Sequence, residues 1–350
     1  MLNYYPNVNA NQKPKRIYLY PISSRGEDIS ANPYISNLAK AIKELGEIVN
    51  LNQPSSSGIF QMILYYRKYN VLFLNWIENI PDRKAGYGQS LLLFALIIIL
   101  RLSGKKIIWV MHNKVSHSKT NFWIKKILFR YLLRYSHLVI THSSEGVRYA
   151  NTVLKKITSN IHYIPHPFDI SCSSYRINKT PKYDFLIWGS MVSYKAVDVF
   201  LTYLKDSGKA DDFRILVIGR FSSESYLEKV KSLAGKRTEI VNQFATKDEL
   251  KELISLSVFV LFTYHDNSVL SSGALMDTIC FGGDVIGPDI GAFADLADEK
   301  LILNYKDYSE IPQLLKLKSE TYAQEVSTIR EKYINSNGWD GLSTKIQHLL

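Results

Sequence analysis

The sequence predicts an α/β protein with two Rossmann-like domains. Short apolar runs alternate with longer segments of helical periodicity, which is typical of parallel sheets covered by helices. The alternation begins again after Pro165 and Pro167, and these two prolines predict a stiff linker. At 350 residues, the chain is long enough for two domains of ordinary size.

In the first half, a strand at 16–22 leads through a loop to a helix that Asn32 and Pro33 begin and Gly46 ends. Neither a G-x-G-x-x-G loop after this strand nor a Walker-type lysine loop occurs, which disfavours nicotinamide and P-loop sites. Further strands are expected at 71–74, 106–110, 138–141 and 161–164.

The second half repeats this order and ends in a helix after Trp339. Its strands are expected at 183–188, 213–218, 258–262 and 285–286, with one more before Gln243.

Composition places the chain among globular proteins, with 46% hydrophobic and 21% charged residues. Cys172 and Cys280 form neither a disulfide framework nor a metal-ligand spacing, which suits a reducing cytoplasm. The first 16 residues lack the apolar core of a signal peptide. The apolar run at 91–100 falls short of the roughly 20 residues that span a membrane, so it predicts a buried or surface-docking helix.

The positive charge lies entirely in the first half. Residues 1–170 contain 22 Lys and Arg against 8 Asp and Glu, a net +14, whereas residues 171–350 carry a net −3. This asymmetry indicates an anionic partner: a membrane surface, a lipid phosphate or nucleic acid. Nucleic acid is the weakest of the three, because the sequence lacks helix-turn-helix, RNP-like and zinc-finger patterns.

A basic amphipathic helix is predicted at 121–135. Lys126, Arg130 and Arg134 recur every four residues and form one stripe, with aromatic and aliphatic side chains around it. Such a helix can lie on an anionic bilayer. The alternative is a solvated basic face above a core-facing apolar one; the charge of the domain favours the membrane.

The segment 268–293 carries the strongest site signal. Ser271, Ser272 and Gly273 begin a predicted helix, and their backbone N–H groups could bind an anion. Asp277 follows one turn later, where its carboxylate could accept hydrogen bonds from a ribose. An ordinary strand–helix unit with a Ser/Gly cap explains this stretch equally well.

This segment resembles the donor site of glycosyltransferases with the GT-B fold, particularly family 4. The family pattern has a Glu, seven residues, a second Glu, and then Ala-Met-Ala-x-Gly-x-Pro-Val-Ile. With the Gly at Gly282, the second Glu falls at Asp277, which is shorter but still acidic. The first Glu falls at Val269, and Asp284 replaces the Pro.

The resemblance extends to the loop after residue 188. The family has Gly-Arg followed by a Lys, and both cations hold the donor diphosphate. Gly189 and Lys195 match this spacing, but Ser190 replaces the Arg, which suggests Arg220 as a substitute cation. Phe244 stands where the nucleotide base commonly packs in such folds.

His112 and Asn113 follow the strand at 106–110. Side chains at the carboxyl end of a parallel strand face the crevice in which such sheets bind ligands. In family 4 a His-Asn pair often stands here, facing the donor sugar and the acceptor. A histidine that caps the next turn is the alternative.

The resemblance implies two domains that face each other across a cleft, with a C-terminal helix that returns to the first domain. The expected parts are 1–168 (acceptor and membrane-facing), 169–335 (donor-binding) and 336–350 (the returning helix). It implies a metal-independent hexosyltransferase that extends a lipid-linked or polysaccharide acceptor, with His112, Lys195 and Asp277 as catalytic residues. The donor is a UDP- or GDP-linked sugar and no further cofactor is expected. Family 4 members retain anomeric configuration, but the missing first Glu leaves retention open.

The expected location is the cytoplasm, on the inner face of the plasma membrane. Three other functions remain open: a nucleotide-sugar 2-epimerase, a non-catalytic relative that binds membrane or glycan, and a basic RNA-binding protein. Turnover of donor without acceptor, nucleotide binding without transfer, and salt-dependent RNA binding would respectively identify them.

Overall fold

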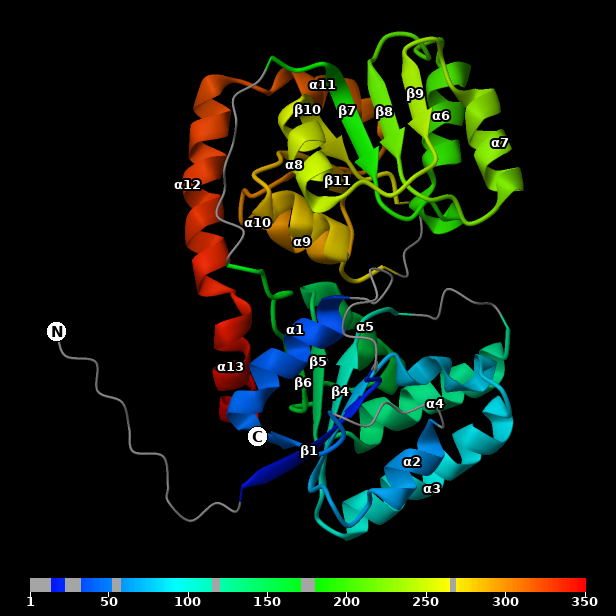
Figure 1. Cartoon of the computed structure of the whole chain (residues 1–350), viewed down its shortest axis with the longest axis vertical. Coiled ribbons are helices and arrows are strands. Elements are labelled where there is room, and N and C mark those ends of the chain that lie inside the picture. Colours follow the sequence, from blue (N-terminus) through cyan, green and yellow to red (C-terminus); the bar gives the residue numbers. More distant parts are fainter. Residues whose placement is uncertain (1–13, 23–32, 52–57, 115–119, 171–179, 265–268) are drawn as a thin grey trace, which may run out of the picture.

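The computed structural model describes residues 14–22, 33–51, 58–114, 120–170, 180–264 and 269–350. Two six-stranded parallel sheets, one in each half of the chain, form the cores of two domains (Figure 1). Helices cover both faces of each sheet, as expected for parallel strands joined by crossover helices. The predicted α/β class with two Rossmann-like domains is confirmed.

The first sheet has the strand order β2-β1-β3-β4-β5-β6. Its elements are β1 (Lys15–Tyr20), α1 (Pro33–Ile42), η1 (Lys43–Leu45), β2 (Gly46–Ile48), α2 (Ile59–Leu64), β3 (Val71–Asn75), η2 (Ile77–Asp82), α3 (Gly86–Leu102), β4 (Lys106–Met111), α4 (Phe122–Tyr135), β5 (Leu138–Thr141), α5 (Ser144–Leu154) and β6 (Ile161–Tyr163).

The second sheet has the order β12-β11-β10-β7-β8-β9. Its elements are β7 (Tyr183–Trp188), η3 (Ser193–Lys195), α6 (Val197–Asp206), β8 (Ile215–Ile218), α7 (Glu224–Leu233), β9 (Thr238–Val241), α8 (Lys247–Ser255), β10 (Ser257–Leu261), α9 (Gly273–Cys280), β11 (Val285–Pro288), α10 (Gly291–Asp298), β12 (Leu303–Tyr305), η4 (Tyr308–Glu310), α11 (Ile311–Lys316) and α12 (Glu320–Ser336).

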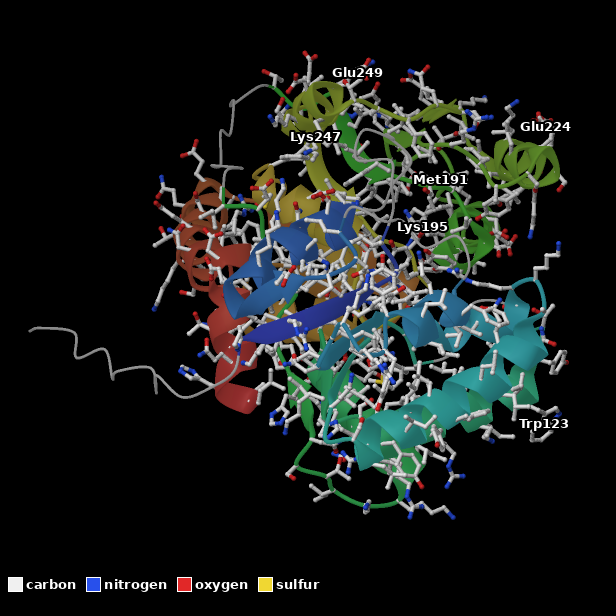
Figure 2. All side chains as sticks on the ribbon, turned by 60° about the horizontal axis from the view of Figure 1, so that its bottom comes forward. Trp123, Met191, Lys195, Glu224, Lys247 and Glu249 are labelled. Carbon is white, nitrogen blue, oxygen red and sulfur yellow. The ribbon has the colours of Figure 1, made fainter. Side chains whose placement is uncertain are left out.

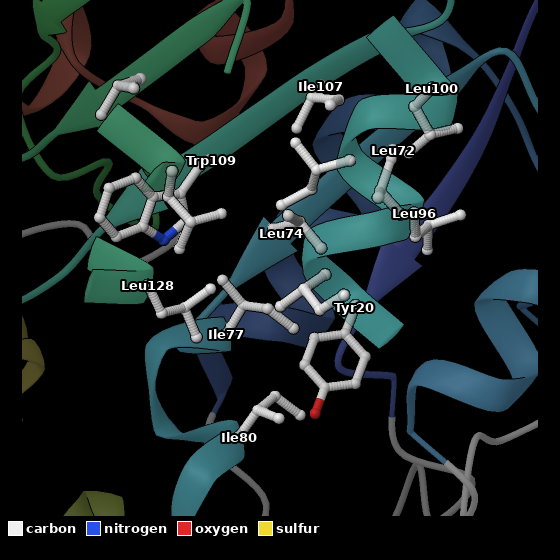
Figure 3. Packing of buried hydrophobic residues seen from close by; sticks show 14 of the residues in the cluster. Tyr20, Leu72, Leu74, Ile77, Ile80, Leu96, Leu100, Ile107, Trp109 and Leu128 are labelled. Carbon is white, nitrogen blue, oxygen red and sulfur yellow. The ribbon is translucent and has the colours of Figure 1, made fainter. Parts of the chain in front are cut away.

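Apolar side chains from the strands meet those of the covering helices. In the first domain, Leu72 and Leu74 of β3 pack with Leu96 and Leu100 of α3, and all four are at most 3% exposed (Figure 3). α3 is therefore a core helix on one side, whereas Leu91, Ile98 and Ile99 of the same apolar run are exposed. None of the described helices is long and apolar enough to cross a membrane.

The strand order reverses once in each sheet, between β1 and β3 and between β7 and β10. At such a switch point, neighbouring loops leave the carboxyl ends of two strands in opposite directions and open a crevice for ligands. The loop after β7 leads to Lys195, and Trp76 directly follows β3. These two switch points position the site described below.

The chain crosses between the domains twice, and the two crossings pair with each other. The Phe168 N–H donates to the Asn337 carbonyl (2.9 Å), and the Trp339 N–H donates to the Phe168 carbonyl (3.2 Å). α12 packs beside the second domain, and η5 (Trp339–Gly341) leads into α13 (Leu342–Leu349), which packs on α1 (Figure 1). The predicted return of the last helix is therefore confirmed.

Some predicted boundaries were wrong. The helix expected to reach Gly46 ends at Ile42, because a 3₁₀ turn and the short strand β2 follow it. β2 and β12 have three residues each, too few for a recognisable pattern. Asn32 and Cys172 lie outside the described residues.

Candidate functional site

A cleft of about 710 Å³ lies between the two domains, at the carboxyl ends of both sheets. Its walls include ten of the predicted site residues, which come from both halves of the chain: His112, Asn113, Gly189, Ser190, Lys195, Phe244, Ser271, Ser272, Gly273 and Asp277. Across the described residues, no group of three or more His, Cys, Asp or Glu side chains could hold a metal ion.

The N-terminus of α9 opens into this cleft, as the sequence predicted. Ser272 is the N-cap residue, but its side chain caps no backbone N–H. Its hydroxyl instead hydrogen-bonds the hydroxyl of Tyr264 (3.1 Å), while the Ser271 Oγ is buried and has no hydrogen-bond partner among the residues that the structure describes. The first N–H groups of a helix have no intrahelical acceptor, so α9 offers donors that an anion in the cleft could use.

Lys195 lies beside these donors and is only 6% exposed. Its Nζ donates to the Trp188 carbonyl (3.3 Å) and lies 5.7 Å from the centre of the Tyr264 ring. No carboxylate pairs with it among the described residues. Burial without a counter-ion lowers the Lys195 pKa to about 8.

Gly189 leaves the space that the Lys195 side chain needs. A Cβ at position 189 would lie 2.9 Å from Nζ, and the backbone there has φ +102°, which side-chain-bearing residues rarely adopt. The match of Gly189 and Lys195 to the family spacing therefore has a steric reason. Glycine lets the loop turn back over the lysine.

Asp277 lies on α9, on the side that faces the cleft, and is exposed to it. The surrounding cleft walls raise its pKa to about 6, Lys247 lowers the pKa, and the carboxylate of Asp169 raises it. Lys247 begins α8 and also lines the cleft. Like Lys195, it belongs to the second domain (Figure 2). Acidic and basic groups thus share the second-domain wall.

Of the other predicted donor-site residues, some line the cleft and one does not. Phe244 and Ser190 line the cleft, and Phe244 is 59% exposed, so its ring is open to a ligand. Arg220 is exposed, but it is not among the cleft-lining residues. The structure therefore does not bring Arg220 together with Lys195 as a second phosphate cation.

His112 faces the second domain from the end of β4. Its Nε2 lies 3.1 Å from Asn75 Oδ1, and the Asn75 amide nitrogen donates to the Tyr20 carbonyl (3.2 Å). The amide is thus oriented with its oxygen toward the ring, so Nε2 carries the proton and Nδ1 is the acceptor. Burial and the neighbouring His142 and His166 lower the His112 pKa well below its usual value, so the ring is neutral.

Asn113, which the sequence predicted to face the acceptor, connects the two domains. It forms an isolated antiparallel bridge with Val269, the position at which the family pattern has its first Glu. Val269 is 4% exposed. A buried aliphatic side chain therefore occupies the place where the resemblance implies a carboxylate.

Lys126, Arg130 and Arg134 lie on α4, away from the cleft, and all three are exposed. Leu128 and Phe129, two of the apolar side chains of this helix, belong to the core. Trp123 is 75% exposed at the outer edge of the first domain (Figure 2). Other exposed apolar side chains on α2, α3 and α4 are Phe60, Ile63, Leu64, Tyr87, Leu91, Ile98, Ile99, Leu102, Phe122 and Ile127.

Sequence reasoning did not assign Trp76, Tyr264 or Lys247, although all three line the cleft. Trp76 follows β3, so its place at a strand end was a usable signal. Tyr264 and Lys247 gave no signal of their own, because their roles depend on contacts with α9 that only the fold creates.

No protein-family model matches the chain, and no curated protein matches it. Solved structures do. Anabaena HepE in complex with UDP-glucose is 10% identical with a TM-score of 0.67, over 95% of this chain and 98% of that one. A glycosyltransferase from Rickettsia africae is 13% identical with a TM-score of 0.61, over 95% and 96%. AviGT4, a glycosyltransferase involved in avilamycin A biosynthesis, is 13% identical with a TM-score of 0.57, over 96% and 97%. The chain therefore has the GT-B fold.

Proposed function

We propose that this protein is a glycosyltransferase that transfers a hexose from a nucleotide sugar to a lipid-linked or polysaccharide acceptor. The donor is UDP- or GDP-linked; UDP is the first choice, because HepE, which shares the fold, binds UDP-glucose. Assignment to family 4 belongs to the same proposal. It rests on the resemblance of Gly189, Lys195 and Asp277 to that family's donor motifs.

The observation that carries the proposal is the buried cation of Lys195, which pairs with no carboxylate in the described parts of the chain. Burial disfavours the charged form of Lys195, so keeping this side chain charged costs folding free energy. A dianionic ligand in the cleft would restore that free energy, and the α9 N-terminus lies ready to bind the same ligand. A nucleoside diphosphate matches this charge, and the cleft is large enough to hold one.

The transfer follows from these positions. An acceptor hydroxyl oxygen bonds to the anomeric carbon while the bond from that carbon to the diphosphate oxygen breaks. The nucleoside diphosphate leaves with the electron pair, and the hydroxyl proton passes to one of its phosphate oxygens. Lys195 and the α9 N–H groups stabilise the charge that grows on the leaving group, so the proposal needs no metal. Proton transfer to the leaving group on the face it departs from would retain configuration.

The remaining side chains position the substrate. Asp277 accepts hydrogen bonds from the ribose hydroxyls, and Phe244 packs against the base. His112, held neutral with Nδ1 as acceptor, binds a hydroxyl of the transferred sugar. A ring with so low a pKa is a poor general base at neutral pH, so its role is to position the sugar.

We also propose that the face formed by α2, α3 and α4 docks on an anionic membrane, which places the protein on the inner face of the plasma membrane. Leu91 and Leu102 of α3 and Trp123 of α4 are at least 70% exposed. The basic stripe lies on α4, which packs against α3. Exposed apolar groups that adjoin cations are typical of helices at the headgroup level.

One observation favours a second candidate, a relative that binds a nucleotide sugar without transferring it. Val269 is buried and bridges Asn113 where the family has a carboxylate. Nucleotide binding without transfer to any acceptor would favour this candidate, whereas turnover of the donor without an acceptor would instead identify an epimerase.

The deciding experiment measures the melting temperature with UDP, GDP and their hexose conjugates. A true donor raises it, because only the folded state binds the ligand. Asp277→Ala should remove most of the rise and leave the unliganded melting temperature unchanged. Lys195→Ala should lower kcat by roughly 10²–10³, Lys195→Arg should recover part of the rate, and Arg220→Ala should have the smaller effect. The reverse order for Lys195 and Arg220 would overturn the assignment of the phosphate cation.

A further inference from the structure

The two walls of the cleft differ in chemistry. The second-domain wall carries Lys195, Lys247 and Asp277, and Asp169 lines the cleft where the chain enters that domain. The first-domain wall, over the residues that the structure describes, has no Asp, Glu, Lys or Arg among the side chains that line the cleft. It consists of aromatic rings and amides, which suit an uncharged ligand.

Trp76 belongs to this wall and directly follows β3 at the switch point of the first sheet. Its ring stacks on His112, with the ring centres 4.1 Å apart and the planes 15° from parallel. Its backbone has φ 46° and ψ 26°, the left-handed region, which is unusual for so large a side chain. Such strain persists where the surroundings enforce it, and it is concentrated at ligand sites.

Tyr34 of α1 fixes the aromatic rings from behind. Its ring packs edge-on against the rings of three residues, with the ring centres 5.8 Å apart for Trp76, 4.8 Å for His112 and 5.2 Å for Trp339. Its hydroxyl lies 2.8 Å from Nε2 of His142, whose Nδ1 lies 2.8 Å from the Ile164 carbonyl. The carbonyl can only accept, so Nδ1 carries the proton and Nε2 accepts from Tyr34. The stack is therefore positioned before any ligand arrives.

The edges of the stack are polar but neutral. Asn37 of α1 and Asn79 of η2 line the cleft beside Trp76. Amides both donate and accept, so they can pair with hydroxyl groups of either orientation. Aromatic faces carry partial negative charge and attract the polarised C–H groups on one face of a sugar ring.

The geometry points to an acceptor subsite for a neutral sugar: a ring of the acceptor packs on the Trp76–His112 stack, and Asn37 and Asn79 bind its hydroxyls. The reacting end of the acceptor is thus the hydroxyl of a glycan, and a lipid carrier, where one is present, lies farther from the centre. This inference rests on the proposed transferase function and specifies its acceptor.

The test is a binding measurement on the whole protein saturated with UDP. The probes are methyl glycosides of glucose, galactose and N-acetylglucosamine, compared with methyl glucuronide and a polyprenyl phosphate in detergent. At least one neutral glycoside should bind saturably, detected by tryptophan fluorescence and by saturation-transfer NMR. Trp76→Leu should weaken that binding about tenfold, and Trp76→Phe should weaken it less.

Tyr149→Leu is the matched control, because Tyr149 is a half-buried aromatic of the first domain outside the cleft. Equal losses in Trp76→Leu and Tyr149→Leu would overturn the subsite, as would binding of the charged probes alone or of none. These outcomes overturn the subsite only if UDP still raises the melting temperature of the unaltered protein. If no nucleotide does so in the unaltered protein, the transferase proposal itself fails.

Discussion

The carboxylate of Glu145, near the start of α5 in the first domain, accepts a hydrogen bond (2.6 Å) from the N–H of Gly291, the first residue of α10 in the second. The contact is reciprocated. Asp295 of α10 accepts from the N–H of Ser144, the first residue of α5 (2.8 Å). Each helix thus supplies an anion to the positive end of the other, and the domains are held together beside the cleft.

Glu145→Ala should loosen this contact. The α10 N-terminus loses its anion, so the Gly291 amide should exchange its hydrogen faster than in the unaltered protein, as measured by mass spectrometry of the peptide that contains it. The control is Glu224→Ala, which removes an exposed first-turn acid from α7. Unchanged exchange at Gly291 in Glu145→Ala would show that the hydrogen bond does not hold the domains.

Lys195→Met should raise the melting temperature without nucleotide. The Lys195 pKa is about 8 in the folded state, compared with about 10.4 in unfolded chains. Between these values the unfolded state binds more protons, so stability rises with pH in this window. The advantage of the Met variant should be greatest below pH of about 8 and should shrink as the pH rises toward about 10.

Nucleotide should reverse the order of the two proteins, because UDP stabilises the charged lysine. Lys205→Met, at an exposed position on α6, is the control and should show no such pH dependence. A melting-temperature difference that stays constant over the whole pH range would contradict the buried-cation interpretation.

Affinity for UDP-glucose should fall as the pH drops through about 6, the pKa of Asp277. The ionised carboxylate accepts from ribose hydroxyls, and protonation removes that acceptor. UDP-glucose is the suitable ligand because its diphosphate diester does not titrate in this range. Asp277→Asn should bind more weakly and lose the pH dependence in calorimetry, whereas Asp212→Asn, at an exposed position away from the cleft, should keep both. The same pH dependence of UDP-glucose affinity in Asp277→Asn and Asp212→Asn would show that Asp277 does not bind the donor.

Replacing Lys126, Arg130 and Arg134 together by Gln should weaken sedimentation with anionic vesicles at low salt. Each cation near such a surface contributes about 1 kcal/mol, and salt should release the unaltered protein by screening. The matched control replaces three exposed lysines of the second domain by Gln: Lys205, Lys251 and Lys316. Equal effects of the two triple variants would mean that α4 is only a solvated face.

Arg330→Met should destabilise the fold by about 3–5 kcal/mol. The Arg330 guanidinium, 2% exposed, donates to the Gly282 and Gly283 carbonyls and to Asp284 (2.8 Å). Its loss takes this donor from both carbonyls and removes one cation from a buried carboxylate that keeps its ion pair with Lys318. Adding Asp284→Asn should cost less than the sum of the single changes in urea unfolding. Lys231→Met, which breaks an exposed pair with Glu228, should cost under about 1 kcal/mol; a similar cost at both sites would refute the account.

The sequence predicted what local chemistry determines. The α9 N-terminus and the Gly189–Lys195 spacing follow from residue type and order, and both lie where they were expected. Asp284 stands where the family 4 pattern has a Pro, and no sequence pattern explains this change. The fold explains it, because Arg330, 46 residues later in the chain, donates a hydrogen bond to the Asp284 carboxylate. Trp76 has a left-handed backbone that no sequence pattern predicts. Arg220 follows a strand, and this position predicted a place in the cleft, but Arg220 is not among the cleft-lining residues.

The return of α13 to the first domain has a consequence for synthesis on the ribosome. Leu342 and Ile346 complete an apolar cluster with α1 and β1, yet the last strand of that sheet, β6, ends at Tyr163. At about 5–20 residues per second, translation leaves the nascent first domain without these side chains for roughly 10–40 s. During that interval its α1 face is an apolar groove that chaperones can bind. Only a late segment of the same polypeptide closes it.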